Sequence, residues 1–190
     1  MRNIAIDVPD NRIGNYAVES FHVSEEKAKS FNLRMLFQLQ YERKIEPGNY
    51  KKLTHNNHVV MSNTPAEIND HYWFCYQAHG TVLLHGLGLG VALKLLLQNK
   101  RVTRIIVVEK SQEVIDLVWN SYKQHKNVFL IRADAFEWKP KKQFKFDFIW
   151  HDIWDYFGED EYNESKKLHR KFGRHCNVKQ DSWCRQQYLR

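Results

Sequence analysis

Cysteine and long apolar runs are scarce in this sequence of 190 residues. The three cysteines, Cys75, Cys176 and Cys184, are an odd number in unlike contexts, which argues against a disulfide framework and favours a reducing cytoplasm. The N-terminus has no long apolar core of the kind found in signal peptides, so no export is expected. The most apolar segment, 82–97, is interrupted by glycines, a histidine and a lysine, and it is shorter than the roughly 20 residues that span a bilayer. We therefore expect no membrane partner.

Paired metal-binding motifs are also absent. His55 and His58 lie three apart in a polar, turn-like stretch, and no C-x-x-C spacing occurs. Four further candidate ligands lie near the C-terminus: His169, His175, Cys176 and Cys184. Without paired spacing we favour structural or surface roles for these side chains and expect no metal site.

Positive charge is in excess, with 29 Lys and Arg against 22 Asp and Glu and a formal net charge of +7. Clustered Lys and Arg would favour a nucleic-acid partner, because they release counterions from phosphates. The excess is diffuse, however, and its densest stretches are 139–145 and 166–174. We favour a solvated basic surface, and nucleic acid stays the less supported alternative.

The first part of the chain, residues 1–63, is predicted to be a small β-containing element. Short apolar runs alternate with polar and turn residues there, as at 16–23 and 58–62. Ser24 followed by two glutamates is typical of a helix N-cap and first turn, which predicts a helix over 24–40.

The second part, residues 64–190, begins with Thr64 and Pro65, a pair typical of the N-cap and first position of a helix. Buried strands then alternate with helices, which is the pattern of a parallel sheet covered on both faces. The predicted strands are 81–85, 104–109, 128–132 and 146–152, and the predicted helices are 91–98, 112–124 and 159–172. We therefore expect an α/β fold with a Rossmann-like parallel sheet.

The sheet is expected to be truncated after the fourth strand, because few residues follow it. Basic helices are predicted in their place, with Asp181 and Ser182 capping a short last helix.

A glycine-rich turn, residues 86–90, follows the first predicted strand and leads into a helix. Glycines allow a tight turn and a close approach to a ligand, and a helix N-terminus offers free N–H groups. A side chain at Gly88 is expected to fill space that the ligand requires. A tight turn without any ligand would show the same glycines, so this motif alone is weak.

Acidic residues end the next three predicted strands: Glu109, Asp134 and Asp152. Glu109 stands nineteen positions past Gly90, a distance at which a carboxylate accepts hydrogen bonds from both ribose hydroxyls in dinucleotide-binding folds. Carboxyl ends of parallel strands meet at one edge, where ligands of open α/β sheets bind. We therefore expect the glycine turn and the three carboxylates to form one site.

From residue 81 to about 155 the sequence resembles class I S-adenosylmethionine-dependent methyltransferases, and most of all their polyamine (spermidine) synthase relatives. The resemblance implies a sheet of the methyltransferase type. It assigns the glycine turn to the methionine part of the cofactor, Glu109 to the ribose and Asp134 to the adenine amino group. With adjoining positions, the implied cofactor site is Gly86, Leu87, Gly88, Gly90, Glu109, Lys110, Asp134 and Ala135.

The stretch 146–155 is similar to the polyamine-synthase segment that ends in a catalytic aspartate. The resemblance carries that role to Asp152, and a second aspartate to Asp155. His151 is a further catalytic candidate, expected to orient or deprotonate the acceptor together with Asp152. Residues 1–63 also resemble the small N-terminal domain of those enzymes.

Two positions depart from the family patterns. Leu84 stands where many methyltransferases carry an acidic residue, and Leu89 stands where polyamine synthases place an aspartate. The leading hypothesis is a methyltransferase-like enzyme that binds S-adenosylmethionine, S-adenosylhomocysteine or methylthioadenosine, with an unknown acceptor. The alternatives are an aminopropyltransferase and a non-catalytic adenosyl-nucleotide-binding module. A homo-oligomer is a further possibility. The C-terminal elements that usually form part of the acceptor-binding pocket are missing from the predicted fold, and a partner chain could supply them.

Overall fold

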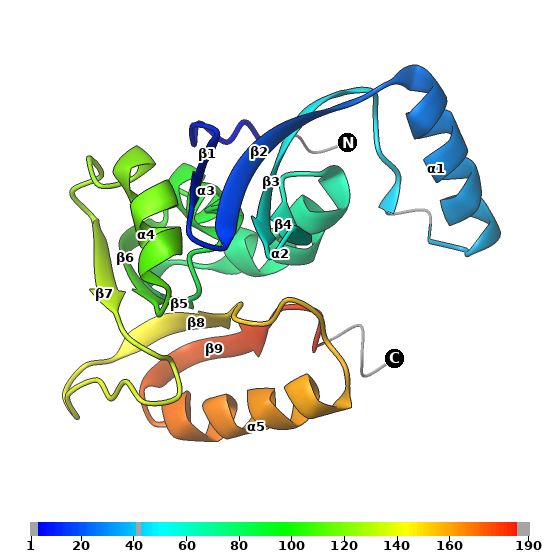
Figure 1. The fold of residues 1–190 in the computed structure, drawn as a ribbon. Coiled ribbons are helices and arrows are strands. Elements are labelled where there is room, and N and C mark those ends of the chain that lie inside the picture. Colours follow the sequence, from blue (N-terminus) through cyan, green and yellow to red (C-terminus); the bar gives the residue numbers. More distant parts are fainter. Residues whose placement is uncertain (1–3, 41–42, 186–190) are drawn as a thin grey trace.

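The computed structural model describes residues 4–40 and 43–185 and contains two sheets (Figure 1). The N-terminal sheet is antiparallel, with strands in the order β1-β2-β3-β4. Its strands are β1 Asn11–Ile13, β2 Tyr16–Val23, β3 Gly48–His55 and β4 His58–Ser62. Asn56 and Asn57 join β3 to β4 with positive φ angles of 51° and 65°, as two-residue hairpin turns of the primed type require. The predicted β element is therefore confirmed.

Helix α1 (Glu25–Phe37) follows β2 and projects beyond the sheet (Figure 1). The Ser24 side chain accepts a hydrogen bond from the backbone N–H of Lys27, so the predicted N-cap is present.

The second sheet is parallel and has the strand order β7-β6-β5-β8-β9. Its strands are β5 Gly80–His85, β6 Val102–Glu109, β7 Val128–Arg132, β8 Phe146–His151 and β9 Cys176–Ser182. The helices around it are α2 Pro65–Gln77, α3 Val91–Gln98, α4 Gln112–Val118 and α5 Glu159–Gly173, with a 3-10 turn η2 at Trp119–Ser121. The order reverses between β5 and β8, so this is a Rossmann-like sheet with a switch point at the carboxyl ends of those two strands.

The predicted truncation after the fourth strand is wrong. β9 pairs in parallel with β8 from Phe146 opposite Cys176 to His151 opposite Ser182, and the intervening α5 supplies the crossover. The sequence of β9 contains a single large apolar residue, Val178, so no hydrophobic pattern marks it. Backbone pairing with β8 and side-chain hydrogen bonds from Gln180 and Ser182 to His169 of α5 hold it in place. Asp181 and Ser182, predicted to cap a last helix, end β9, and residues 186–190 of that prediction lie outside the described residues.

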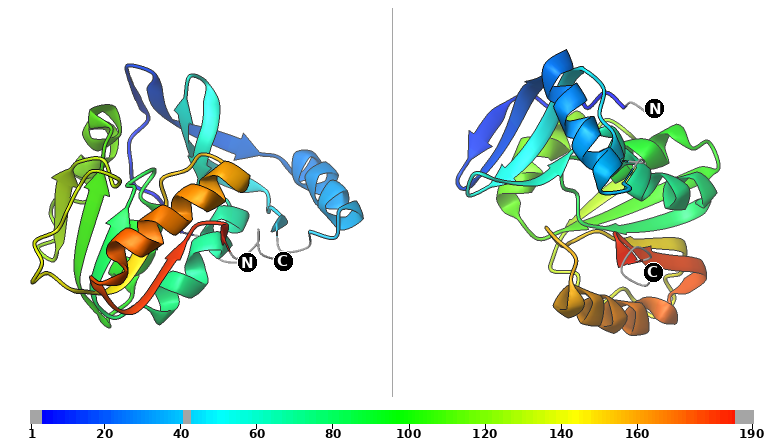
Figure 2. Two further views of the ribbon diagram at one scale, coloured as in Figure 1. Left: turned by 90° about the horizontal axis from the view of Figure 1, so that it is seen from below. Right: turned by 90° about the vertical axis from the view of Figure 1, so that its right-hand side faces the viewer.

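The two faces of the parallel sheet pack against different elements. Val82 and Leu84 belong to a core that includes α2, α3 and α4 and continues into the N-terminal sheet. Leu83 and Ile149 belong to a second core beneath α5. Figure 2 shows α5, in orange, and the N-terminal strands, in blue, on opposite sides of this sheet. The predicted division at residue 63 thus falls between two sheets that share one core. No described helix is long and apolar enough to cross a membrane.

Two histidines meet in the core beneath α5. Their Nδ1 atoms, from His85 and His151, are 2.8 Å apart, and both side chains are fully buried. One Nδ1 must donate and the other accept, so the contact suits two neutral rings. Burial lowers the pKa of His85 to about 3, with a smaller contribution from Lys171, and burial lowers the pKa of His151 well below its usual value. This core is therefore sensitive to acid.

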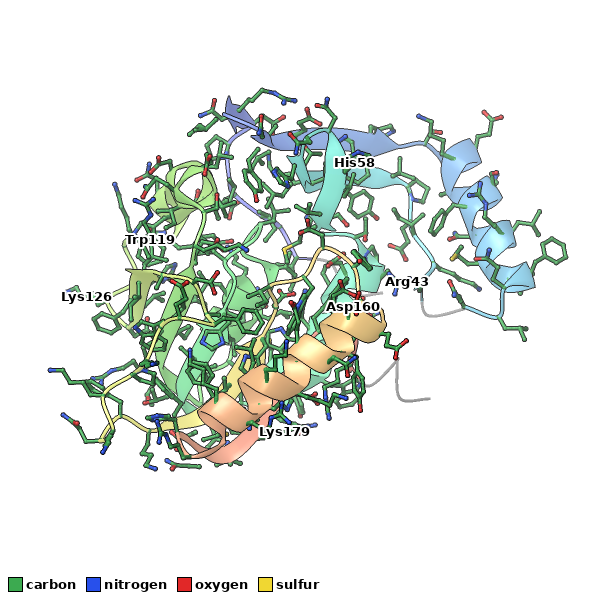
Figure 3. All side chains as sticks on the ribbon, turned by 60° about the horizontal axis from the view of Figure 1, so that its bottom comes forward. Arg43, His58, Trp119, Lys126, Asp160 and Lys179 are labelled. Carbon is green, nitrogen blue, oxygen red and sulfur yellow. The ribbon has the colours of Figure 1, made fainter. Side chains whose placement is uncertain are left out.

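We predict that the free energy of unfolding falls as the pH drops below about 6.5, where unfolded histidines take up protons that His85 and His151 in the folded state do not. The expected slope is up to about 1.4 kcal/mol per pH unit for each histidine. Urea denaturation between pH 7.5 and 5 measures it. The double variant His85→Leu/His151→Leu should show a shallower slope, whereas the exposed control His58→Gln, at the position labelled in Figure 3, should match the wild type. Equal slopes in all three proteins would contradict the prediction.

Candidate functional site

A cavity of about 450 Å³ lies where β5, β6, β7 and β8 end, beneath the N-terminal sheet. Its volume falls within the range of about 300–1,000 Å³ that is usual for small-molecule sites. The predicted site residues that line it are Gly86, Gly88, Glu109, Lys110, Asp134, Ala135, Asp152 and Asp155. The strand-end carboxylates and the glycine turn thus surround one cavity.

Leu87 and Gly90, also predicted to bind the cofactor, do not line the cavity. Leu87 is buried and donates its backbone N–H to Glu109. Gly90 is the N-cap of α3 at a φ of +85°, and the ring of Tyr122 fills the space where a Cβ would lie. Both residues therefore support the conformation of the glycine turn without contacting the cavity.

His151 is placed away from the cavity, so the predicted catalytic role does not fit its position. Its side chain packs beneath α5 against His85 and Phe172. Successive residues of a strand point to opposite faces, and Asp152 therefore lies on the other side, toward α2. His151 and Asp152 cannot address the same acceptor.

Gly86 is held against the end of β8. Its φ is +90°, and a Cβ on it would overlap the backbone carbonyl oxygen of Asp152. The backbone N–H of Asp152 in turn donates to the carbonyl oxygen of His85 at 2.9 Å. This close approach of two backbones explains why glycine stands at position 86, and it brings Asp152 beside the glycine turn.

Met61 covers the middle of the glycine turn, and no sequence pattern pointed to it. Its Sδ accepts the backbone N–H of Leu89 at 3.2 Å. A Cβ built on Gly88 would lie 2.7 Å from the same sulfur. The space above Gly88, expected to be reserved for a ligand, is therefore filled by a side chain from β4. A ligand group that reaches the Leu89 N–H must displace Met61, whose unbranched side chain can change its conformation.

Glu109 joins the two turns at the centre of the sheet. Its Oε2 accepts the backbone N–H of Leu87 and its Oε1 that of Ser111, both at 2.8 Å. A carboxylate has about four acceptor positions, so two remain for further donors. Glu109 is 9% exposed and lines the cavity, so those positions are available there.

Asp134 begins the turn after β7. Its Oδ1 accepts the backbone N–H of Phe136 at 2.7 Å, which fixes the orientation of the carboxylate. Lys171 of α5 donates to the backbone carbonyls of Ala135 and Phe136 at 3.0 and 2.6 Å. The turn that carries Asp134 is thereby anchored to α5.

The cavity is acidic although the chain is basic. Its carboxylates are Glu67, Glu109, Asp134, Asp152, Asp155 and Glu161. Lys110 and His55 also line it. Glu67 comes from α2 and Glu161 from α5, and the sequence analysis assigned neither to a site. Such a lining favours ligands that carry positive charge.

Three of the other histidines named above have structural contacts. His55 stacks on the ring of Tyr16 with 4.3 Å between centroids, His169 shares a hydrogen bond with Ser182, and His175 with the carbonyl oxygen of Phe144. Within residues 4–40 and 43–185, no group of three or more His, Cys, Asp or Glu side chains is arranged to hold a metal ion.

No protein-family model and no curated protein sequence matches this chain. Among solved structures, a protein of Nostoc punctiforme assigned as an O-methyltransferase is similar with a TM-score of 0.47 and 16% identity, over 62% of this chain and 36% of that one. Coclaurine N-methyltransferase gives 0.46 and 20%, over 62% and 35%. The N-methyltransferase NodS of Bradyrhizobium japonicum gives 0.46 and 16%, over 58% and 57%. This chain thus spans less than two thirds of the length of each of these structures.

We predict that Gly86→Ala destabilises the protein far more than Gly14→Ala. Both glycines have positive φ, but a Cβ on Gly14 meets only the Glu113 side chain, at 3.5 Å or more, whereas on Gly86 it overlaps backbone. Gly14→Ala should cost about 1 kcal/mol, since it carries only the left-handed backbone penalty. Gly86→Ala should cost about 3 kcal/mol or more, because the ends of β5 and β8 must separate. Denaturant unfolding measures both, and equal costs would refute the close approach of Gly86 to Asp152.

Proposed function

We propose that this chain binds S-adenosylmethionine in the cavity at the switch point and is a methyltransferase-like enzyme with an unidentified acceptor. The observation that carries the proposal is the convergence of the glycine turn with Glu109, Asp134 and Asp152 on one cavity. Each carboxylate comes from the end of a different strand or the turn after it, which is the arrangement expected for recognition along an extended nucleotide.

The residues present fit an adenosyl group. Glu109 keeps two acceptor positions for ribose hydroxyls, and the fixed carboxylate of Asp134 has Oδ2 left for an adenine amino group. The methionine part would then extend toward Gly86 and Met61. Carboxylates that line this part of the cavity suit the positive charge of a sulfonium.

The bound cofactor would supply a methyl group activated by that sulfonium. The chain itself would position the acceptor and take up its proton, since such transfers need mainly alignment of the nucleophile. Asp152 is suited to the proton, because burial raises its pKa to about 6 against the opposing effect of His71. Asp155 lines the cavity nearby and is more exposed, at a position where it can contact an entering acceptor.

Aminopropyl transfer is the second candidate, and the acidic lining of the cavity is the observation that favours it. Glu67, Asp152 and Glu161 provide carboxylates for an amine acceptor. Leu89 stands against it, because the aspartate that polyamine synthases use for the amino group of their cofactor is missing. Polyamine-synthase and methyltransferase activity are separated by supplying S-adenosylmethionine and its decarboxylated form in parallel.

We predict that Asp134→Asn removes the preference for adenine. Phe136 N–H holds Oδ1, so asparagine would turn its amide NH₂ toward the base in place of Oδ2. Calorimetric titration should give the wild type about a tenfold preference for S-adenosylhomocysteine over S-inosylhomocysteine, and the variant little or none. Glu137→Gln, an exposed change three residues away, is the control. A variant that keeps the wild-type preference would show that Asp134 does not read the base.

We further predict that Asp152→Asn keeps cofactor affinity within about threefold but lowers turnover by roughly 10²–10⁴, because it retains shape and loses basicity. Turnover is measured as S-adenosylhomocysteine released from S-adenosylmethionine with a panel of amine, hydroxyl and thiol acceptors. Full activity in the variant would remove Asp152 from the mechanism. Tight binding by the wild type without turnover on any acceptor would support the non-catalytic module instead.

A further inference from the structure

His71 lies behind the cavity wall, between two of the carboxylates that line it. Its Nε2 is 3.8 Å from Oε1 of Glu67 and 3.8 Å from Oδ2 of Asp152. Its side chain is fully buried, and neither ring nitrogen has a hydrogen-bond partner among the described residues. A buried imidazole without hydrogen bonds costs stability, so its position between two carboxylates needs a reason.

The surroundings of His71 favour its protonated form. Burial alone lowers the pKa of His71, but Asp152 and then Glu67 and Asp70 raise it, and the net direction is upward. The ring of Trp150 packs against the His71 imidazole in a T-shaped arrangement, with 5.9 Å between centroids, so that face of the imidazole contacts an uncharged side chain. An imidazolium here would lie 3.8 Å from two carboxylates and partly neutralise the negative charge of each.

The other charged and titratable groups near this pair come from several elements. Asp70 lies on α2 and forms an ion pair with Arg43 at 3.4 Å. Glu109 ends β6 and adds negative potential at Asp152. The thiols of Cys75, which is buried, and Cys184, which is partly exposed, are in turn affected by the charge of Asp152. Apart from Arg43, which is paired with Asp70, His71 is the one cationic group among those named here.

We propose that His71 is a positioning residue for Asp152: as an imidazolium between Glu67 and Asp152, it keeps the Asp152 carboxylate ionised and aimed at the cavity. The inference rests on the proposed function, because it concerns the base of that site. It gives α2, which lies outside the parallel sheet, a defined part in the chemistry. Glu67 is included because it approaches the same Nε2 atom of His71 as Asp152 does, through an i, i+4 contact on α2.

The proposal follows from the balance of charges at Asp152. Burial raises its pKa, and Glu67, Asp70 and Glu109 raise it further, while His71 is the group that lowers it. At a separation of 3.8 Å in a poorly solvated site, an opposite charge lowers the pKa of a carboxyl by one unit or more. Without His71, the pKa of Asp152 would rise further, so a larger share of the carboxyl would be protonated at neutral pH and unable to act as a base.

The test is a carboxyl ¹³C NMR titration of Asp152 in the wild type, in His71→Gln and in the exposed control His58→Gln. We expect the wild type and the control to titrate near pH 6, and His71→Gln to titrate at least about one unit higher. Adding Glu67→Gln to His71→Gln should bring the value partly back down, because it removes a negative neighbour. An unchanged Asp152 titration in His71→Gln would overturn the proposal.

If His71→Gln does not fold, the wild type still decides. The ¹⁵N chemical shifts of the His71 imidazole at pH 7 should be those of an imidazolium. Shifts typical of a neutral imidazole would overturn the proposal. If the wild type binds neither S-adenosylmethionine nor S-adenosylhomocysteine, the proposed function fails, while the Asp152 titration still tests His71.

Discussion

The carboxylate of Glu109 is the contact on which the rest of the site depends. It receives one backbone N–H from the glycine turn after β5 and another from the turn between β6 and α4. These two turns stand side by side at the carboxyl edge, and a single buried anion joins them. Removing it would leave two N–H groups without acceptors and free the turns that form the cavity floor. The same carboxylate has acceptor positions left at the cavity, so the ribose recognition proposed above would depend on the residue that also holds the two turns.

The alternation of side chains at the end of β8 places His151 and Asp152 on opposite faces of the parallel sheet. His151 faces α5 and joins a neutral, acid-sensitive histidine pair in the core, whereas Asp152 faces α2 and the cavity. The N-terminal sheet then closes the cavity from above and contributes Met61 to the glycine turn. The β-containing N-terminal element is therefore part of the site, and α2 connects it to the parallel sheet.

Periodicity in the sequence was sufficient to predict the strongly apolar elements, and the bounds of α3 and β7 agree with the prediction. The strand-end carboxylates were predictable too, because a parallel sheet gathers them at one edge. β9 was not, since its polar sequence has no hydrophobic pattern and it is held by pairing with β8 and by hydrogen bonds to α5. Met61, Glu67 and His71 reach the site through packing between elements distant in sequence, which no local pattern encodes.

We propose that the cavity at the switch point holds an adenosyl group. A crystal structure of the chain grown with S-adenosylhomocysteine tests it most directly. We predict the ribose hydroxyls within hydrogen-bond distance of Glu109, the adenine amino group at Asp134 and the sulfur on the side of Asp152. A ligand bound elsewhere, or no binding at saturating concentration, would contradict the claim.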